Sequence, residues 1–385
     1  MYTLRLIVKN SLRHKLRTSL TILGLVVAIF AFGLLQTVID AWYAGAEGAS
    51  NTTLVTRNKT SLVFPLPLSY EARIRAVPGV TGVGYANWFQ GTYKDPKNFF
   101  AQFAISGESY LEIYPDYLLP PDQRAAFLRD RKGALVGRKL ADQFGFKVGD
   151  VIPLKGTIYP GDWELVVRGI FDGRQSTTNT ATLFLHWDYV NESLKKTLPR
   201  RANQIGVYVV RIDEPENAAA ISAAIDKEFS NSLAETLTET EKAFQLGFVS
   251  MSEAIVMAIR VVSFVVIVII AAVMANTMAM SARERLGEYA TLKALGFGPG
   301  FLTAMILGES LLLSLFGAAL GIVILFPFAA FLGSVMGTMF PVFEVTRLTV
   351  LQQILAALAI GLVAAIAPTL RAARVNIVEG LRSIG

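Results

Sequence analysis

Two carboxylates one helical turn apart, Glu284 and Glu288, lie in the segment ERLGEYATLKALG (284–296), between two long apolar stretches. Carboxylates at this spacing lie on the same side of a helix and can pair with cations of another surface. When the segment is projected on a helix, small side chains share one stripe about 100° wide. These small residues are Gly287, Ala290, Thr291 and Ala294.

The carboxylates border this stripe, and Arg285, Tyr289 and Lys293 lie around the far side of the predicted helix. Small side chains let another surface approach the backbone closely, and the bordering charges would set its register. A helix that lies in a membrane surface would instead need a large apolar face. We therefore interpret the segment as a docking site for another protein, and the alternative is a solvated connector.

Other constellations of reactive side chains argue against an enzyme. The chain has no cysteine, and His14 and His186 are its only histidines. A thiolate zinc site is thereby excluded, and a histidine metal site or a Ser-His-Asp triad is not expected. Carboxylates are frequent between residues 43 and 235, but none forms a recognisable acid/base pair. We therefore predict neither catalytic nor metal-binding residues.

Three further residues stand out in the apolar stretch MILGESLLLSLFGAALG (305–321). Glu309 is a carboxylate within a membrane-length segment, where ionisable groups are costly and often functional. A hydrogen bond to a neighbouring helix or loop is the favoured interpretation, and a proton relay or gate is the alternative. Gly317 and Gly321 form a G-x-x-x-G motif that permits close helix packing, either within the subunit or in a dimer.

Four apolar segments are long enough to cross a bilayer, which requires roughly 20 residues. The chain has 385 residues, of which 53% are hydrophobic. The predicted spans are 19–42, 261–281, 300–333 and 347–368. Between the first and second span lie residues of ordinary soluble composition, enough for a domain with its own core. The fold class we predict is a membrane protein of four transmembrane α-helices with a large extracytoplasmic α/β domain between the first and second.

The orientation follows from the distribution of charge. Residues 43–252 hold 23 Lys/Arg and 23 Asp/Glu, whereas residues 1–18 carry only basic charge. Excess Lys/Arg in short segments marks the cytoplasmic side. The N-terminus, the 282–299 loop and the tail are therefore expected inside, and the large domain outside. The net charge of +6 follows this pattern, so nucleic-acid binding is not expected.

The first span could instead be a signal peptide cleaved near AWYAGAEG (41–48). Its apolar run is about twice as long as the roughly 7–15 residues of a signal-peptide core. We therefore favour an uncleaved membrane anchor.

Local patterns predict the elements of the large domain. Alternation predicts strands at 99–107, 163–171 and 204–212, and helices are expected at 69–80, 139–144 and 216–232. Residues 236–260 have no proline, and we predict a stalk helix that continues into the second span, with a loop followed by a separate helix as the alternative. The apolar segment LVFPLPLS (62–69) is read as a buried connection, with a lipid- or partner-contacting loop as the alternative. DQRAAFLRDRKG (122–133) is read as a solvated helix face.

The segment ARERLGEYATLKALGFGPGFL (282–302) resembles the cytoplasmic loop of FtsX-like/MacB-like ABC transporter permeases, a mechanotransmission class related to macrolide exporters. NSLRHKLRTSLTILGLVVAIF (10–30) and PTLRAARVNIVEGLR (368–382) are similar to the family's two ends. In the large domain, GALVGRKLADQFGFKVGDVIPL (133–154) and VVRGIFDG (166–173) resemble its periplasmic core. The resemblance covers nearly the whole chain.

The resemblance implies that 282–299 is a coupling helix inserted into a cytoplasmic ATPase. The expected contact residues are Glu284, Arg285, Glu288, Tyr289 and Lys293. The sequence contains no G-x-x-x-x-G-K-[ST] motif, so we expect a stand-alone permease. ATP and Mg would bind to a separate ATPase subunit, and this chain would carry no cofactor. Other expected partners are a second permease copy or paralogue, a periplasmic adaptor and the lipid bilayer of the cytoplasmic (inner) membrane.

These expectations divide the chain into ten segments. They are a cytoplasmic segment (1–18), a first span (19–42), a periplasmic core domain (43–235), a stalk (236–260), a second span (261–281), a coupling helix (282–299), a third span (300–333), an extracytoplasmic loop (334–346), a fourth span (347–368) and a cytoplasmic tail (369–385).

Three functions are compatible with such a permease. The first, which the resemblance of the large domain to the family's periplasmic core favours, is efflux or export with a periplasmic adaptor. The second is extraction of lipids or lipoproteins from the membrane. The third is signalling to a cell-wall hydrolase without transport. A hydrophobic cleft in the large domain would support lipid handling, and the sequence does not identify the cargo.

Overall fold

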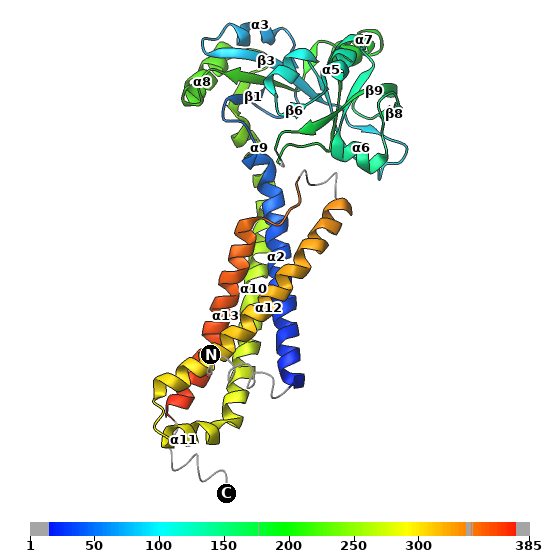
Figure 1. Ribbon diagram of the computed structural model, residues 1–385. Coiled ribbons are helices and arrows are strands. Elements are labelled where there is room, and N and C mark those ends of the chain that lie inside the picture. The colour runs from blue at the N-terminus through cyan, green and yellow to red at the C-terminus, as the bar shows by residue number, and fades with distance from the viewer. Residues whose placement is uncertain (1–14, 176, 336–339, 341, 375–385) are drawn as a thin grey trace. The chain divides into compact units, whose positions relative to one another are not determined.

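The computed structural model describes residues 15–175, 177–335, 340 and 342–374. Most of the predicted N-terminal segment, much of the tail and part of the 334–346 loop lie outside these residues. The chain forms two compact units (Figure 1). The membrane unit comprises Met1–Asp40, Glu253–Leu332 and Phe343–Gly385, and the α/β unit comprises Ala41–Ser252 and Gly333–Val342.

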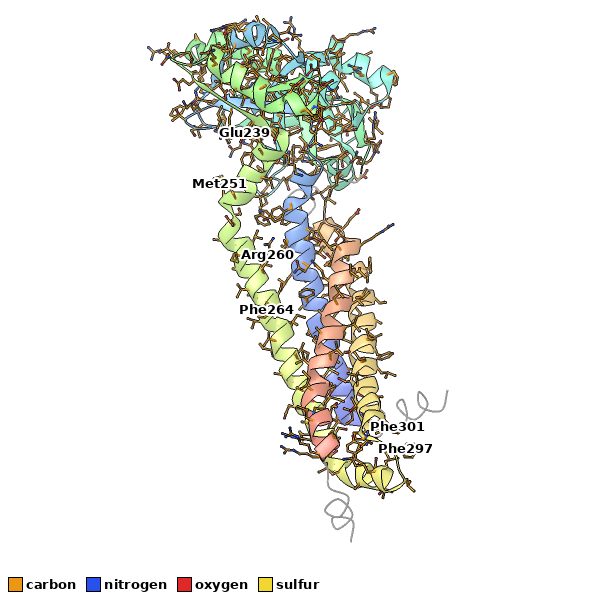
Figure 2. All side chains as sticks on the ribbon, turned by 90° about the vertical axis from the view of Figure 1, so that its left-hand side faces the viewer. Glu239, Met251, Arg260, Phe264, Phe297 and Phe301 are labelled. Carbon is orange, nitrogen blue, oxygen red and sulfur yellow. The ribbon has the colours of Figure 1, made fainter. Side chains whose placement is uncertain are left out.

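Within the described residues, four helices are long and apolar enough to cross a membrane, which confirms the predicted membrane protein of four transmembrane helices. They are α2 (Lys15–Glu47), α10 (Glu253–Glu284), α12 (Pro299–Val335) and α13 (Arg347–Arg374). Large apolar side chains on their outward faces are exposed, for example Phe264 on α10, one turn after Arg260 (Figure 2). Such faces suit lipid, because no polar backbone group needs a partner there.

Small residues let the helices of the membrane unit pack closely. A Cβ atom at Gly317 would lie 2.6 Å from Leu25 Cβ, and one at Gly321 would lie 2.9 Å from the Val26 carbonyl oxygen. Both contacts join α12 to α2, so the G-x-x-x-G motif packs within the subunit. The sequence had left this choice open.

Buried polar side chains link the same helices. Gln353 Nε2 on α13 donates to the Ile29 carbonyl of α2 at 2.8 Å. Ser310 Oγ on α12 donates to the Gly361 carbonyl of α13 at 2.7 Å. In hydrocarbon, where water is absent, such bonds hold helices at a defined rotation.

A mixed sheet of eleven strands forms the framework of the α/β unit. The path of neighbouring strands is β13 (Thr236–Thr240), β1 (Thr53–Asn58), β12 (Val207–Ile212), β3 (Val80–Trp88), β5 (Ala101–Ile105), β10 (Thr182–His186), β7 (Gly133–Gly137), β9 (Gly161–Gly173), β8 (Val151–Gly156) and β4 (Gly91–Thr92). The eleventh strand, β6 (Tyr117–Leu118), pairs with β9, and β2 (Leu66–Pro67) pairs separately with β11 (Gln204–Ile205).

Helices cover both faces of this sheet, because alternate strand residues point to opposite sides. In β7, Ala134 and Val136 belong to one apolar core and Leu135 to the other. The first core includes side chains of α3 (Tyr70–Arg75), α6 (Arg138–Phe144), α7 (Trp187–Thr197) and α8 (Ala218–Glu228). The second includes side chains of α4 (Glu108–Ile113) and α5 (Pro121–Arg129).

The predicted stalk helix at 236–260 is wrong in its first part. Residues 236–240 form β13, which completes the sheet by pairing with β1. The following helix, α9 (Glu241–Met251), begins where Thr240 Oγ1 accepts a hydrogen bond from the Ala243 amide. A second interruption at Ser252, with φ −107° and ψ 11°, separates α9 from α10. Threonine occupies every second position of 236–240, which is typical of a strand. The prediction of a helix relied instead on the absence of proline.

Another expectation is corrected in part. In LVFPLPLS (62–69), Leu66 is buried, but Val63 is 86% exposed and Phe64 is 53% exposed, so the segment is only partly a buried connection. In DQRAAFLRDRKG (122–133), read as a solvated helix face, the charged residues are mostly exposed, and α5 buries Phe127 completely on its other side. Its single large aromatic residue anchors a helix that is otherwise mostly polar.

Candidate functional site

The predicted docking segment folds as two helical pieces rather than one. Helix α10 continues through Glu284, and Arg285, with φ −108° and ψ 11°, separates it from α11 (Leu286–Ala294). Gly296, at φ +92°, then turns the chain toward α12. Left-handed backbone of this kind favours glycine. The short helix α11 therefore lies across the end of the membrane unit, between α10 and α12 (Figure 1).

A buried ion pair joins this junction to α12. Arg285 Nη1 donates to Glu309 Oε2 at 2.9 Å, and the two side chains are only 8% and 7% exposed. Arg285 Nε also donates to Glu288 Oε2 at 3.1 Å. Glu309 thus has the hydrogen bond to the loop that the sequence favoured. Because a buried charge without a partner is very unfavourable, the pair holds the start of α11 against α12.

The surroundings of Arg285 preserve its charge. Burial alone would lower the pKa of Arg285, but the negative charges of the Glu309 and Glu288 carboxylates help to raise it above its usual value. Burial also raises the pKa of Tyr289 to about 12, so this phenol stays neutral. The guanidinium carbon lies 5.5 Å from the centre of the Tyr289 ring. The cation is therefore held by two carboxylates and one aromatic face.

Polar contacts also tie the segment to the other two helices. Arg17 of α2 makes two parallel hydrogen bonds with the Glu284 carboxylate, at 2.7 and 2.8 Å. Lys293 Nζ of α11 donates to the Ala373 carbonyl at the end of α13, at 2.8 Å. Glu284 ends α10, so the α10–α11 junction and α11 are bonded to α2, α12 and α13 together.

The stripe of small residues is divided between the inside and the outside of the unit. Ala290 is completely buried, and Gly287 is partly buried. Thr291 and Ala294 are exposed, and they continue into the exposed apolar residue Leu295, which is 72% exposed. An open surface of small and apolar residues therefore lies on the C-terminal half of α11.

The structure separates the predicted site residues into two groups. Arg285 and Tyr289 are buried, whereas the Glu284 and Glu288 side chains are 41% and 42% exposed. Arg17 was not predicted as a site residue. Its position as a basic residue at the start of a span could have indicated a contact with the carboxylates of the 282–299 segment. Leu295 and Phe297 were not predicted either; the latter packs on Phe301 with ring centres 4.7 Å apart (Figure 2).

The remaining candidates for chemistry have structural partners. His186 is buried, with its ring stacked on Phe127 and Nε2 2.8 Å from the Phe127 carbonyl oxygen. Within the residues that the structure describes, no group of three or more His, Asp or Glu side chains is placed to hold a metal ion.

Comparison with known proteins connects both units to one class. Residues 260–377 match the model of the FtsX-like permease C-terminal region, and residues 18–228 match the MacB-like periplasmic core domain. An uncharacterized ABC transporter permease of Methanocaldococcus jannaschii is 27% identical over 338 residues, which cover 82% of this chain and 80% of that protein.

Two solved structures are similar to parts of the chain. One is the extracellular domain of the noncanonic ABC-type transporter YknZ from Gram-positive bacteria, with a TM-score of 0.36 and 11% identity over 49% of this chain and all of that one. The other is a permease domain from Porphyromonas gingivalis, with a TM-score of 0.32 and 17% identity over 49% of this chain and 88% of that one.

Four long helices, with an α/β domain between the first and second, define a multi-pass membrane protein of the ABC permease class. The MacB-like model covers more than half of the sequence, and the FtsX-like model covers most of α10 and all of α11, α12 and α13. The chain therefore belongs to the FtsX-like/MacB-like ABC transporter permeases. Membership of this family implies an ATPase partner.

Proposed function

We propose that this chain couples ATP hydrolysis by a separate cytoplasmic ATPase subunit to movement of its α/β unit. The observation that carries the proposal is the attachment of α11 and its junction to α2, α12 and α13 through Glu284, Arg285 and Lys293. A force applied to α11 therefore acts on all the membrane helices at once. The ATPase supplies the nucleotide chemistry, and this chain contributes no catalytic residue.

The exposed half of α11 is the proposed contact surface. Thr291, Ala294 and Leu295 face outward, and the partly exposed Glu284 and Glu288 border them. A groove on the ATPase can approach Thr291 and Ala294 closely, and Leu295 can enter an apolar pocket. Arg285 and Tyr289 act from behind this surface, because their burial makes them positioning residues for the helix.

A bulky side chain in the small stripe tests the contact surface. We expect Ala294→Trp to abolish co-purification of an ABC ATPase from native membranes, because the indole would prevent close approach. The matched control is Ala304→Trp, at an exposed alanine on α12 away from the stripe. Both variants should insert and fold, since neither position is buried. Equal recovery of an ATPase with wild type and Ala294→Trp, or no ATPase with wild type, would contradict the proposal.

The excess of basic residues in the short segments supports an orientation with α11 in the cytoplasm and the α/β unit outside. In a bacterial cell this corresponds to the cytoplasmic (inner) membrane. We further propose that two permease chains, identical or related, pair around a two-fold axis, each with one ATPase.

Export with a periplasmic adaptor is the transport function we propose. It is supported by the MacB-like match over residues 18–228. Extraction of lipids or lipoproteins is the second candidate, and an apolar surface pocket in the α/β unit, described below, supports it. Crosslinking in intact cells distinguishes the two: an adaptor crosslinked to the α/β unit supports export, and lipoprotein crosslinked without an adaptor supports extraction.

A further inference from the structure

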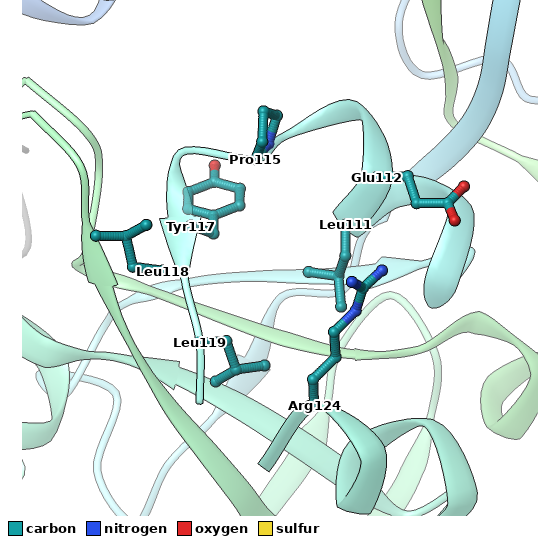
Figure 3. Close-up of a pocket in the computed structure, with 7 residues that line it drawn as sticks. All are labelled: Leu111, Glu112, Pro115, Tyr117, Leu118, Leu119 and Arg124. Atoms are coloured by element: carbon teal, nitrogen blue, oxygen red, sulfur yellow. The ribbon is translucent and has the colours of Figure 1, made fainter. Parts of the chain in front are cut away.

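A pocket of about 390 Å³ lies on the α4–α5 face of the α/β unit (Figure 3). Its lining comes from α4, β6 and the beginning of α5. The lining residues are Leu111, Glu112, Pro115, Tyr117, Leu118, Leu119 and Arg124. Five of them are apolar or aromatic, and the volume is within the usual range of small-molecule sites.

One feature of this pocket points to a ligand. Arg124 Nε is buried and donates no hydrogen bond to any residue that the structure describes. In Figure 3 the guanidinium lies beside Leu111, and the Glu112 carboxylate is directed away from it. A buried charged donor without an acceptor is costly, because it has lost water and gained nothing in return. An acceptor supplied from outside would remove this cost.

Other arginines of the same unit show that the lack of a partner is not general. Arg168 pairs with Asp130 at 2.7 Å, and Arg138 pairs with Asp172 at 2.9 Å. Arg124 differs from them because the surface around it is apolar rather than acidic. The only carboxylate that lines the pocket is Glu112, which is exposed.

We propose that this pocket binds a small amphipathic carboxylate, with its head group at Arg124 and its apolar chain against Leu111, Leu118 and Leu119. A guanidinium presents N–H groups in a plane that matches the two oxygens of a carboxylate. A phosphate dianion fits less well, because the pocket offers one cation and the second negative charge would have no partner. The site is a feature of the α/β unit, and its existence does not depend on coupling to an ATPase.

Photolabelling of the full chain tests this site directly. The protein is placed in phosphatidylcholine nanodiscs and illuminated with a diazirine derivative of decanoic acid, and labelled residues are mapped by mass spectrometry. We expect labelling within residues 111–124, and competition by unlabelled decanoate. The matched probe is the corresponding diazirine decanol, which has the same chain without the charge, and it should label this region about tenfold less.

Variants test separately the contact of Arg124 with the ligand's carboxylate and the contact of the apolar wall with its hydrocarbon chain. Arg124→Gln should reduce labelling of residues 111–124 by the acid about tenfold or more, because the charged hydrogen bonds are lost. Arg129→Gln, at an exposed arginine of the same helix, should leave it unchanged. Leu118→Asp, at a side chain that is 42% exposed, should also abolish labelling by placing a charge in the apolar wall.

Three outcomes would overturn the proposal. They are labelling confined to the long membrane helices, equal labelling of residues 111–124 by acid and alcohol, and full labelling of Arg124→Gln. The comparison of the acid probe with the alcohol probe uses the wild-type chain, so it tests the proposal even if a variant fails to fold. Co-purification of the ATPase is an independent measurement, so failure of this proposal and failure of the coupling proposal are distinguishable.

Discussion

Two ion pairs, one from each unit of this permease, lie in opposite environments. In the α/β unit, pairs such as Arg138–Asp172 lie at the surface, with side chains about half exposed, at 48% and 52%. In the membrane unit, Arg285 and Glu309 are 8% and 7% exposed. The α/β unit thus keeps pairs such as Arg138–Asp172 in contact with water and is stabilised by two apolar cores, whereas the membrane unit encloses the Arg285–Glu309 pair at the base of α11.

Exposed and buried ion pairs contribute differently to stability and to geometry. A surface pair contributes little, because water screens it and the side chains lose freedom. A buried pair contributes little net stability either, but it enforces one arrangement, since separating its members leaves an uncompensated charge. Arg285–Glu309 is therefore well suited to transmit movement between α11 and α12 without slipping.

The largest expected effect comes from removing one member of the buried pair. Arg285→Met leaves Glu309 without its cation and should destabilise the membrane unit by about 3–5 kcal/mol. Arg138→Met, at the exposed pair, should change the stability of the α/β unit by less than about 1 kcal/mol. Denaturation with SDS in mixed micelles measures both free energies of unfolding.

A double variant separates pairing from packing. Arg285→Met combined with Glu309→Met should recover most of the stability, because no buried charge then remains. It should still lose coupled ATPase stimulation if the pair transmits movement. If Arg285→Met costs no more than Arg138→Met, the contrast between the units is wrong.

An intermediate effect is expected from the close packing of α12 on α2. A Cβ atom at Gly321 would meet backbone atoms of α2, Val26 O at 2.9 Å and Phe30 N at 3.2 Å, which cannot move aside. Gly321→Ala should cost about 1–3 kcal/mol. Gly300→Ala, in the same helix but with open space around it, should be neutral or slightly stabilising. The same denaturation measurement applies, and equal costs at the two positions would contradict this packing.

The smallest effect is a dependence on pH that is confined to the α/β unit. Burial lowers the pKa of His186 below its usual value near 6.5. The folded state therefore favours neutral His186, whose contribution is complete above pH ~6.5 and is lost as pH falls from there through the lower folded pKa. For one proton the slope is at most about 1.4 kcal/mol per pH unit.

Three of the four tryptophans, Trp88, Trp163 and Trp187, lie in β3, β9 and α7 of the α/β unit, and the fourth, Trp42, lies on α2. In a Trp42→Phe background, fluorescence during urea unfolding therefore reports on the α/β unit. His186→Gln should flatten the dependence between pH 7 and pH 5. The described part of the membrane unit contains no histidine. An unchanged pH profile in His186→Gln would assign the effect to another group.

Much of the architecture could be predicted from local sequence. Runs of roughly 20 apolar residues are sufficient to identify the spans, since only a helix can satisfy its backbone in hydrocarbon. Alternation identified strands such as β5 and β12 because one residue in two meets each core. Local pattern did not predict the strand at 236–240, because this strand depends on pairing with β1, a segment about 180 residues earlier.

The candidate site shows the same division between local pattern and long-range contact. The type and spacing of Glu284 and Glu288 predicted a docking helix, and Glu309 was recognisable because a carboxylate is costly within a span. Sequence spacing could not reveal that Arg285 faces Glu309 or that Arg17 faces Glu284, 267 residues away. These pairings exist only because close packing of small residues brings the ends of the helices together. Composition and periodicity thus determined the helices and their charges, and tertiary packing decided which charges meet.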